Sequence, residues 1–124
     1  MELIAELGAG LGEVGRARRV LARALHRWDV DGAVADIALL LASELVTNAV
    51  RHGGPPVVVR AGLSHEGALR VDVTDDEPGD VRPQRAMPHD DGGRGLYLVD
   101  KLSDRWGYQA TTSGKRVWFE VSAR

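Results

Sequence analysis

The sequence predicts an α+β domain: a two-layer sandwich in which a mostly antiparallel, mixed sheet carries about three helices on one face. Segments with the two-residue period of strands and segments with the helical period of about 3.6 residues follow in the order β-α-α-β-β-loop-α-β-β. Consecutive strands that are joined by short turns pair antiparallel, and the helices then share one face of the sheet. With 124 residues, the chain has the size of one domain, residues 1–124.

Composition narrows the functional classes before any motif is considered. Hydrophobic residues make up 44% and charged residues 27%, proportions that fit a soluble globular protein and exclude a disordered one. The sequence has no cysteine, which excludes disulfides and thiol chemistry, and its net charge of −2 argues against a nucleic-acid binder. No apolar stretch approaches the ~18 residues of a membrane span, and no signal-like N-terminus is present. We therefore expect a cytoplasmic protein that binds neither membrane nor nucleic acid directly.

The N-terminal part predicts one short strand and two helices. Residues 2–7 alternate in the manner of a strand, and from Val14 to Trp28 the apolar residues fall on one helical stripe. Arginines run along the other side of this helix; they could hold an acidic partner, but a solvated face is the favoured interpretation. The second helix has Asp31 as its N-cap and the Gly-Gly-Pro-Pro run at 53–56 as its stop. Because it is apolar over most of its circumference, we expect it to be central.

A hairpin follows the second helix. Residues 57–63 and 69–73 both alternate, and the segment 64–67 between them predicts a turn. The run from Thr74 to Asp80 is rich in acids, proline and glycine, so we expect the second strand to end there.

The last part of the chain predicts a loop, a helix and a second hairpin. Residues 80–94 contain prolines, glycines and charges without any period, and we expect them to be a mobile lid that orders around a ligand. A short helix runs from Leu96 to about Leu102. Alternating residues at 106–110 and 117–121 then form a hairpin across a Thr-Ser-Gly turn.

A glycine motif near the N-terminus does not indicate a dinucleotide-binding site. The run from Gly10 to Gly15 satisfies G-x-G-x-x-G and opens a helix, as in dinucleotide-binding folds. That fold needs a parallel strand directly after its first helix, whereas residues 33–52 predict another helix. We therefore interpret these glycines as a flexible connection.

Several polar residues could together bind a nucleotide. Glu44 and Asn48 lie four residues apart on the apolar helix and project from the same face; structural partners would explain either one taken alone. Asp75 stands where a strand ends, a position from which a carboxylate in an apolar pocket can accept a hydrogen bond from the amine of adenine. The segment Gly92–Gly95 opens a helix whose N-terminal backbone N–H groups can bind phosphates. Arg94 within it adds a guanidinium group that can donate two hydrogen bonds to phosphate oxygens. An amide oxygen suits Mg²⁺ and a carboxylate suits proton transfer, so these are the parts of an ATP site.

With these motifs the sequence resembles the GHKL (Bergerat-fold) ATP-binding domains of gyrase, Hsp90 and histidine kinases. Within that superfamily it looks most like the small stand-alone anti-sigma-factor serine/threonine kinases. The resemblance covers nearly the whole chain, and its most specific signal is the N box together with the second glycine box. The matching segments, in chain order, are the N box Glu44–His52, the partial D-x-G-x-G segment Asp75–Gly79, the glycine box Gly93–Val99, and the closing segments Arg105–Gly107 and Gly114–Phe119.

The resemblance implies an ATP-dependent protein kinase of regulatory type. It would transfer the γ-phosphoryl group of ATP, with Mg²⁺, to a serine or threonine of a small antagonist protein. Its partners would be that anti-sigma-factor antagonist or a sigma factor, and a homodimer is left open. By the resemblance Glu44 is the general base and Asn48 the Mg²⁺ ligand; the nucleotide-binding residues are Asn48, His52, Asp75, Gly79, Gly93, Arg94, Gly95 and Leu96.

Two departures keep a second function open. Glu77 stands where the family usually has glycine, beside the adenine-binding Asp75. Lys115 stands where the wider superfamily often has a threonine, whose hydroxyl supports the adenine-binding carboxylate. Asp90 and Asp91 also put negative charge into the lid, which opposes phosphates. The alternative is a non-catalytic, protein-binding regulator of the same fold with weak or no ATP binding. The catalytic domain of a sensor histidine kinase is disfavoured, because 124 residues leave no room for a phosphoacceptor helix pair.

Overall fold

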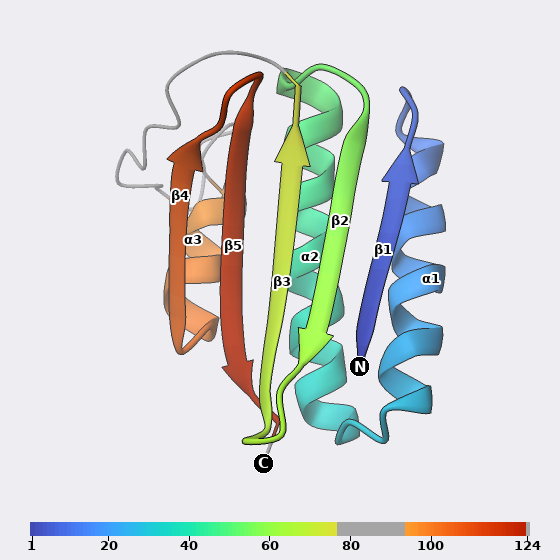
Figure 1. Ribbon diagram of the computed structural model, residues 1–124, viewed down its shortest axis with the longest axis vertical. Coiled ribbons are helices and arrows are strands. Elements are labelled where there is room, and N and C mark those ends of the chain that lie inside the picture. Colours follow the sequence, from blue (N-terminus) through green and yellow to red (C-terminus); the bar gives the residue numbers. More distant parts are fainter. Residues whose placement is uncertain (77–93, 124) are drawn as a thin grey trace.

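The computed structural model describes residues 1–76 and 94–123, of which Arg94 and Gly95 are described by their backbone alone. The expected lid at 80–94 therefore lies almost wholly outside the described residues, as does Glu77. In the described part, five strands form one sheet in the order β1-β2-β3-β5-β4, and every pairing between them is antiparallel (Figure 1). The elements are β1 (Glu2–Leu7), α1 (Gly12–Arg27), α2 (Gly32–His52), β2 (Val57–Leu63), β3 (Ala68–Asp75), α3 (Arg94–Leu102), β4 (Arg105–Ala110) and β5 (Lys115–Ser122).

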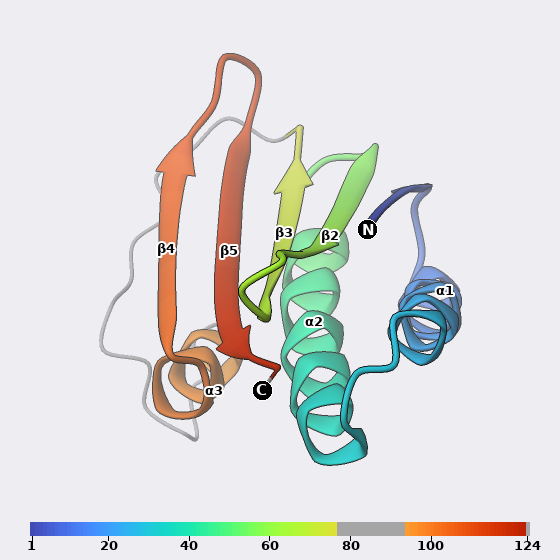
Figure 2. The ribbon, with the colours of Figure 1, turned by 60° about the horizontal axis from the view of Figure 1, so that its bottom comes forward.

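The three described helices lie on one face of the sheet, as Figure 2 shows, with α2 between α1 and α3. This arrangement confirms the predicted α+β class, the order of the elements and the single helical layer. The core lies between α2 and the sheet, where Leu41 and Leu45 of α2 are buried together with Val71 of β3 and Phe119 of β5. The inward-facing apolar side chains of the strands and the apolar stripe of α2 therefore pack against each other in one layer.

The second helix begins and ends where the sequence predicts, whereas α1 begins two residues before the predicted Val14 and ends one residue before Trp28. Asp31 caps α2, since its Oδ1 accepts a hydrogen bond of 2.8 Å from the Ala33 N–H. The stripe of α1 is buried at Ala17, Leu21, Ala24 and Leu25. The arginine row lies on the exposed side of that helix, as a solvated face would; it consists of Arg16, Arg19, Arg23 and Arg27.

The antiparallel sheet also agrees with the rejection of a dinucleotide fold. β1 pairs antiparallel with β2, and α2 follows α1 with no strand between them. The glycine-rich segment before α1 is a connection in which Gly10 adopts a φ of 102°, a value that favours glycine.

The structure corrects the expected end of the second strand. β3 continues through Thr74 to Asp75. Thr74 is paired on both sides, with Val58 of β2 and Arg116 of β5, and Asp75 is paired on one side, with Lys115 of β5. This pairing outweighs the low strand propensity of aspartate, and a pattern within a single strand does not reveal it.

A second correction concerns α2. Among the described residues, this helix of 21 residues is long and apolar enough to cross a membrane by length and composition, with a mean hydropathy of 1.6 over its most apolar window. The expectation that no apolar segment reaches this length was therefore wrong. Its buried stripe packs against the sheet, and core helices of globular domains meet the same criterion.

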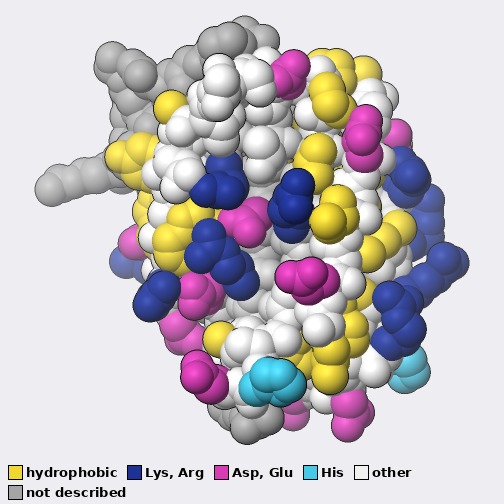
Figure 3. Space-filling view, viewed as in Figure 1, with side chains coloured by type: hydrophobic (Ala, Val, Ile, Leu, Met, Phe, Trp, Pro, Cys, Tyr) yellow, Lys and Arg dark blue, Asp and Glu magenta, His cyan; other side chains and the backbone are white. Residues whose placement is uncertain are grey.

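The other face of the sheet carries no described helix, and Figure 3 shows charged side chains of both signs there among a few apolar ones. Arg70 forms ion pairs with Asp72 at 3.2 Å and Glu120 at 3.8 Å, and Arg105 pairs with Glu120 at 3.1 Å. The Arg70 guanidinium also lies 4.2 Å from the centre of the Trp118 ring. Exposed ion pairs of this kind add little stability singly, and Trp118 lies on this face because its neighbour Phe119 points into the core.

Candidate nucleotide site

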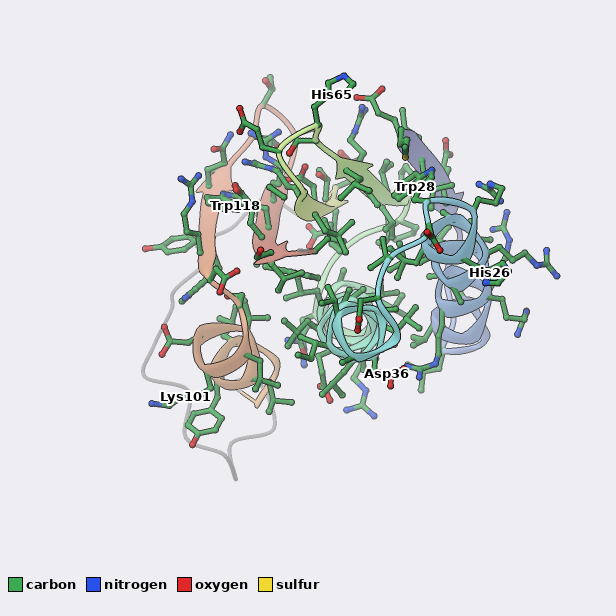
Figure 4. The ribbon with its side chains drawn as sticks, turned by 90° about the horizontal axis from the view of Figure 1, so that it is seen from below. His26, Trp28, Asp36, His65, Lys101 and Trp118 are labelled. Carbon is green, nitrogen blue, oxygen red and sulfur yellow. The ribbon has the colours of Figure 1, made fainter. Side chains whose placement is uncertain are left out.

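The predicted functional residues of α2 lie along one flank of the helix. Glu44 and Asn48 are half-buried, whereas His52 is exposed in the last turn. Ser43 accepts a hydrogen bond of 3.2 Å from the Arg18 guanidinium of α1, so it marks the flank that faces α1. At about 100° per residue, Glu44 and Asn48 lie across the buried stripe from Ser43. Because α2 lies between α1 and α3 (Figure 4), their flank is the one nearer α3.

Asp75 lies at the end of β3 and is buried, with 5% of its surface exposed. Its Oδ1 accepts a hydrogen bond of 3.1 Å from Nζ of Lys115, the residue directly opposite on β5. Gly53, directly after α2, packs so closely that a Cβ there would stand 2.5 Å from the Asp75 carboxyl carbon. The Asp76 N–H donates to the Gly54 carbonyl oxygen at 2.9 Å. The ends of α2 and β3 are therefore held together at the carboxylate.

The third part of the site is α3. It runs beside α2 in the opposite direction, so its N-terminus lies at the end of the domain where α2 and β3 end (Figure 1). Arg94 and Gly95 form its first turn, and Leu96 is half-buried against the core. Such an N-terminus presents backbone N–H groups and the positive end of the helix dipole. Gly79 and Gly93 lie outside the described residues.

The end of α2, the end of β3 with Asp75 and the start of α3 thus lie at the same end of the domain, and Glu44 and Asn48 lie in the half of α2 that leads to it. Two cavities of about 140 and 190 Å³ are lined by described residues, and neither is at this end. The smaller lies where β5 ends, beside Gly67 and Ser122, and the larger lies on the open sheet face beside Gly62.

Sequence reasoning missed one close neighbour of Asp75 and the ion pair made by another. Gly53 was expected only to stop α2. Lys115 was expected near the adenine-binding carboxylate, because the threonine usual at its position supports that carboxylate, but its ion pair with Asp75 was not predicted. A signal for Lys115 was available, because it shares the phase of Phe119 and Val121 on β5 and therefore points to the helical layer. A lysine on the buried phase of a strand needs an acidic partner.

Comparison with known proteins assigns the family. Residues 7–121 match the family model of the histidine kinase-like ATPase domain. The chain belongs to this family. An uncharacterized protein of Streptomyces coelicolor is 37% identical to this histidine kinase-like ATPase domain over 71 residues, which are 54% of this chain and 68% of the relative.

Solved structures share the fold of this ATPase domain. The RsbU and RsbW domains of Rv1364c from Mycobacterium tuberculosis match with a TM-score of 0.77 and 22% identity, over 98% of this chain and 32% of that one. A blue-light activated histidine kinase from Erythrobacter litoralis matches with a TM-score of 0.59 and 26% identity, over 77% of this chain and 32% of its own. The chain therefore spans about a third of the length of these two solved chains.

The residues of this ATPase domain fit ATP with Mg²⁺, the ligand that the family implies. Asp75 offers a buried acceptor for a base amine, and α3 offers an N-terminus for phosphates. In the described part of the chain, no group of three or more His, Asp or Glu side chains could hold a metal by itself. Asn48 therefore fits Mg²⁺ only as one ligand beside phosphate oxygens and water, which is how Mg²⁺ is commonly bound with nucleotides.

Proposed function

We propose that this protein binds ATP with Mg²⁺ and transfers the γ-phosphoryl group to a serine or threonine hydroxyl of a small antagonist protein, as anti-sigma-factor kinases do. The observation that carries this proposal is the pair Glu44 and Asn48, one helical turn apart and half-buried on the flank of α2 nearer α3. At this spacing a proton acceptor and a metal ligand stand side by side, which is what phosphoryl transfer to a hydroxyl requires. The family membership of residues 7–121 supports ATP as the ligand.

Each residue has a distinct task in this proposal. Asp75 accepts a hydrogen bond from the exocyclic amine of adenine, and the backbone N–H groups at the start of α3 bind the phosphates. Asn48 would hold Mg²⁺ through its amide oxygen, and the metal would supply positive charge that neutralises the phosphates. Glu44 accepts the proton of the incoming hydroxyl. The hydroxyl oxygen forms its bond to the γ-phosphorus while the bond to the β–γ bridging oxygen breaks, and ADP leaves with that electron pair.

The likeness to a solved chain that contains an RsbW domain supports the choice of a protein substrate over a small molecule. The same fold hosts unrelated chemistry, however, so the choice rests on the experiment below. The alternative is a non-catalytic regulator that binds its protein partner with little need of ATP. The ion pair between Lys115 and Asp75 favours this alternative, because it satisfies the adenine-binding carboxylate within the protein itself.

Phosphate transfer tests the proposal. The protein is incubated with radiolabelled ATP, Mg²⁺ and small single-domain antagonist proteins from the same genome, and label on a serine or threonine is measured. We expect Glu44→Ala to retain ATP affinity in calorimetry while the rate of transfer falls ~10²–10⁴-fold, the usual cost of losing a general base. If the wild type binds ATP but labels no antagonist, the binding-only alternative is correct. If Glu44→Ala unfolds by circular dichroism, Glu44 is a structural residue instead.

A further inference from the structure

We propose that the outer edge of β1 and the arginine row of α1 together form a docking surface for an extended segment of a partner protein. The segment adds to the sheet as a further strand beside β1. Its acidic side chains face the arginine row, and its basic and apolar side chains lie on the open face of the sheet. Neither β1 nor α1 supplies a residue of the candidate nucleotide site, so this inference is independent of the proposed function.

The outward-pointing backbone groups of β1 follow from its pairing. β2 is the single neighbour of β1 among the described strands, so β1 is an edge of the sheet. The Leu63 N–H donates to the carbonyl oxygen of the opposite Met1 at 3.1 Å. Hydrogen-bonded and non-hydrogen-bonded pairs alternate along an antiparallel ladder, so the N–H and C=O groups of Glu2, Ile4 and Glu6 point away from β2. Outward groups of this kind can pair with another strand.

One arginine of the row already reaches this edge. Arg16 Nη1 donates to the Glu6 carbonyl oxygen at 3.1 Å and lies 3.5 Å from a carboxylate oxygen of Glu13. The first contact confirms that the Glu6 carbonyl points outward, and it shows that a guanidinium group of the row extends to the strand edge. The other three arginines of the row are exposed, and within the described residues they have no ion pair or side-chain hydrogen bond. They can therefore bind a partner.

The row and the edge run side by side over similar lengths. α1 packs beneath β1 at this end of the sheet (Figure 2), and Figure 3 shows a column of basic side chains where α1 runs in Figure 1. From Arg16 to Arg27 the helix rises about 16 Å, and from Glu2 to Glu6 the strand rises about 13 Å. An added strand of about seven residues therefore follows the whole row.

The charges on the two sides of the edge have opposite signs. Successive side chains of an added strand point to opposite faces of the sheet. Those on the helical side meet the arginine row, whose guanidinium groups bind carboxylates well. Those on the open face meet Glu2, Ile4 and Glu6, where Ile4 is 61% exposed between the two carboxylates. The surface thus fits acidic residues that alternate with basic ones, with an apolar residue beside Ile4.

Other negatively charged partners fit this surface less well. A helix that lies on a membrane needs an exposed apolar face, whereas the apolar stripe of α1 is buried at Leu21 and Leu25. A nucleic-acid backbone carries negative charge alone, and Glu2 and Glu6 at the strand edge repel it. A protein strand with alternating charges matches both signs, so we assign a protein partner.

Fluorescence anisotropy with a labelled peptide tests the proposal on the full chain. The probe is the peptide Glu-Lys-Glu-Val-Glu-Lys-Glu with blocked ends, which carries the alternating pattern in either direction. Its control contains the same residues with all glutamates consecutive. We expect the wild type to bind the probe at least ~10-fold more tightly than the control peptide, and added salt to weaken the binding.

Charge reversal tests the arginine row. We expect Arg23→Glu to weaken probe binding ~10-fold, because it replaces an attraction with a repulsion. The matched control is Lys101→Glu, which changes the net charge by the same amount and should leave probe binding unchanged. Lys101 lies on the outer side of α3, away from α2 (Figure 4), and α2 separates α3 from α1.

A proline tests the backbone pairing. Ile4→Pro removes an N–H that points away from β2, a position where edge strands tolerate proline. We expect the variant to fold and to bind the probe at least ~10-fold more weakly. If it does not fold by circular dichroism, two probes replace it, each N-methylated at every second backbone amide. The probe whose methyl groups face β1 should lose binding, and the probe whose methyl groups face solvent should keep it.

Several results would overturn the inference. These are a wild type that does not bind the probe, equal binding of the probe and the control peptide, an Arg23→Glu variant that binds like Lys101→Glu, and equal binding of both methylated probes. Sedimentation with phosphatidylcholine vesicles, with and without phosphatidylserine, adds a further arm. Binding to the phosphatidylserine vesicles without probe binding would assign the row to a membrane surface instead. No nucleotide enters these measurements, so their failure leaves the proposed function untouched.

Discussion

Asn48 differs from Glu44 in what its loss should change. The amide oxygen is the one protein ligand that we assign to Mg²⁺, and the metal when bound would neutralise phosphate charge. We therefore expect Asn48→Ala to lower ATP affinity ~10-fold or more with Mg²⁺ present, and to change it little when EDTA removes the metal. Calorimetry in the two buffers measures both affinities. An equal loss in both buffers would show that Asn48 contacts the nucleotide directly or supports the fold.

Asp75 should determine which base is bound. In Asp75→Asn the side chain keeps its size but can turn an amide N–H toward the base, where adenine offers a donor. We expect ATP affinity to fall by ~1–3 kcal/mol and the preference for ATP over GTP to shrink. Competition between the two nucleotides, measured by fluorescence of a labelled ATP analogue, checks this. Retention of wild-type ATP affinity would remove Asp75 from the site. The substitution also breaks the ion pair with Lys115, so stability is measured in parallel.

The residue types of the site could be predicted from the sequence, whereas their surroundings could not. Because Glu44 and Asn48 are four residues apart, they lie on one face of any helix that contains them, independent of the rest of the chain. That this face is the one nearer α3 follows only from the tertiary structure. The hydrogen bond between Arg18 and Ser43 marks the flank of α2 that faces α1, and α2 lies between α1 and α3. Contacts between helices depend on packing, which a local pattern does not contain.

At the scale of elements, α2 carries most of the helical side of the core. Leu41 is 0% exposed and its neighbour Leu40 is 38% exposed, so they form a matched pair in one helix. We expect Leu41→Ala to lower the free energy of unfolding by ~2–5 kcal/mol, because it removes buried apolar surface and leaves a cavity. Leu40→Ala should cost well under half as much. Urea denaturation measures both, and equal losses would contradict the assigned orientation of α2.

The strands show where element prediction is limited. The order of the strands along the chain agrees with the sequence patterns, but the register of the last hairpin does not. The alternation predicts that residues 106, 108 and 110 face residues 117, 119 and 121, whereas the structure places Trp106 opposite Phe119, Tyr108 opposite Val117 and Ala110 opposite Lys115. The end of β3 was placed too early, because Asp75 has a low strand propensity by itself. Pairing with β5 on one side and the ion pair to Lys115 extend the strand to this residue.

At the scale of the whole molecule, nucleotide binding should stabilise the fold, because the proposed site joins α2, β3 and α3. A ligand at 100 times its Kd adds about 2.7 kcal/mol to the free energy of unfolding. For a domain of this size, that raises Tm by roughly 10 °C. Differential scanning calorimetry with ATP and Mg²⁺ checks the shift, and Asp75→Asn is the control in which it should shrink. An unchanged Tm at millimolar ATP would favour the binding-only regulator.

The sequence by itself determined the fold class, the order of the elements and the residue types of the candidate site, among them Glu44, Asn48 and Asp75. These follow from local periods and short spacings, which act within one element. Only the tertiary structure decided that Lys115 and Gly53 enclose the Asp75 carboxylate, because they lie 40 residues after it and 22 before it in the chain. Such residues meet through strand pairing and through the packing of α2 on the sheet, and both depend on the whole chain folding into one core.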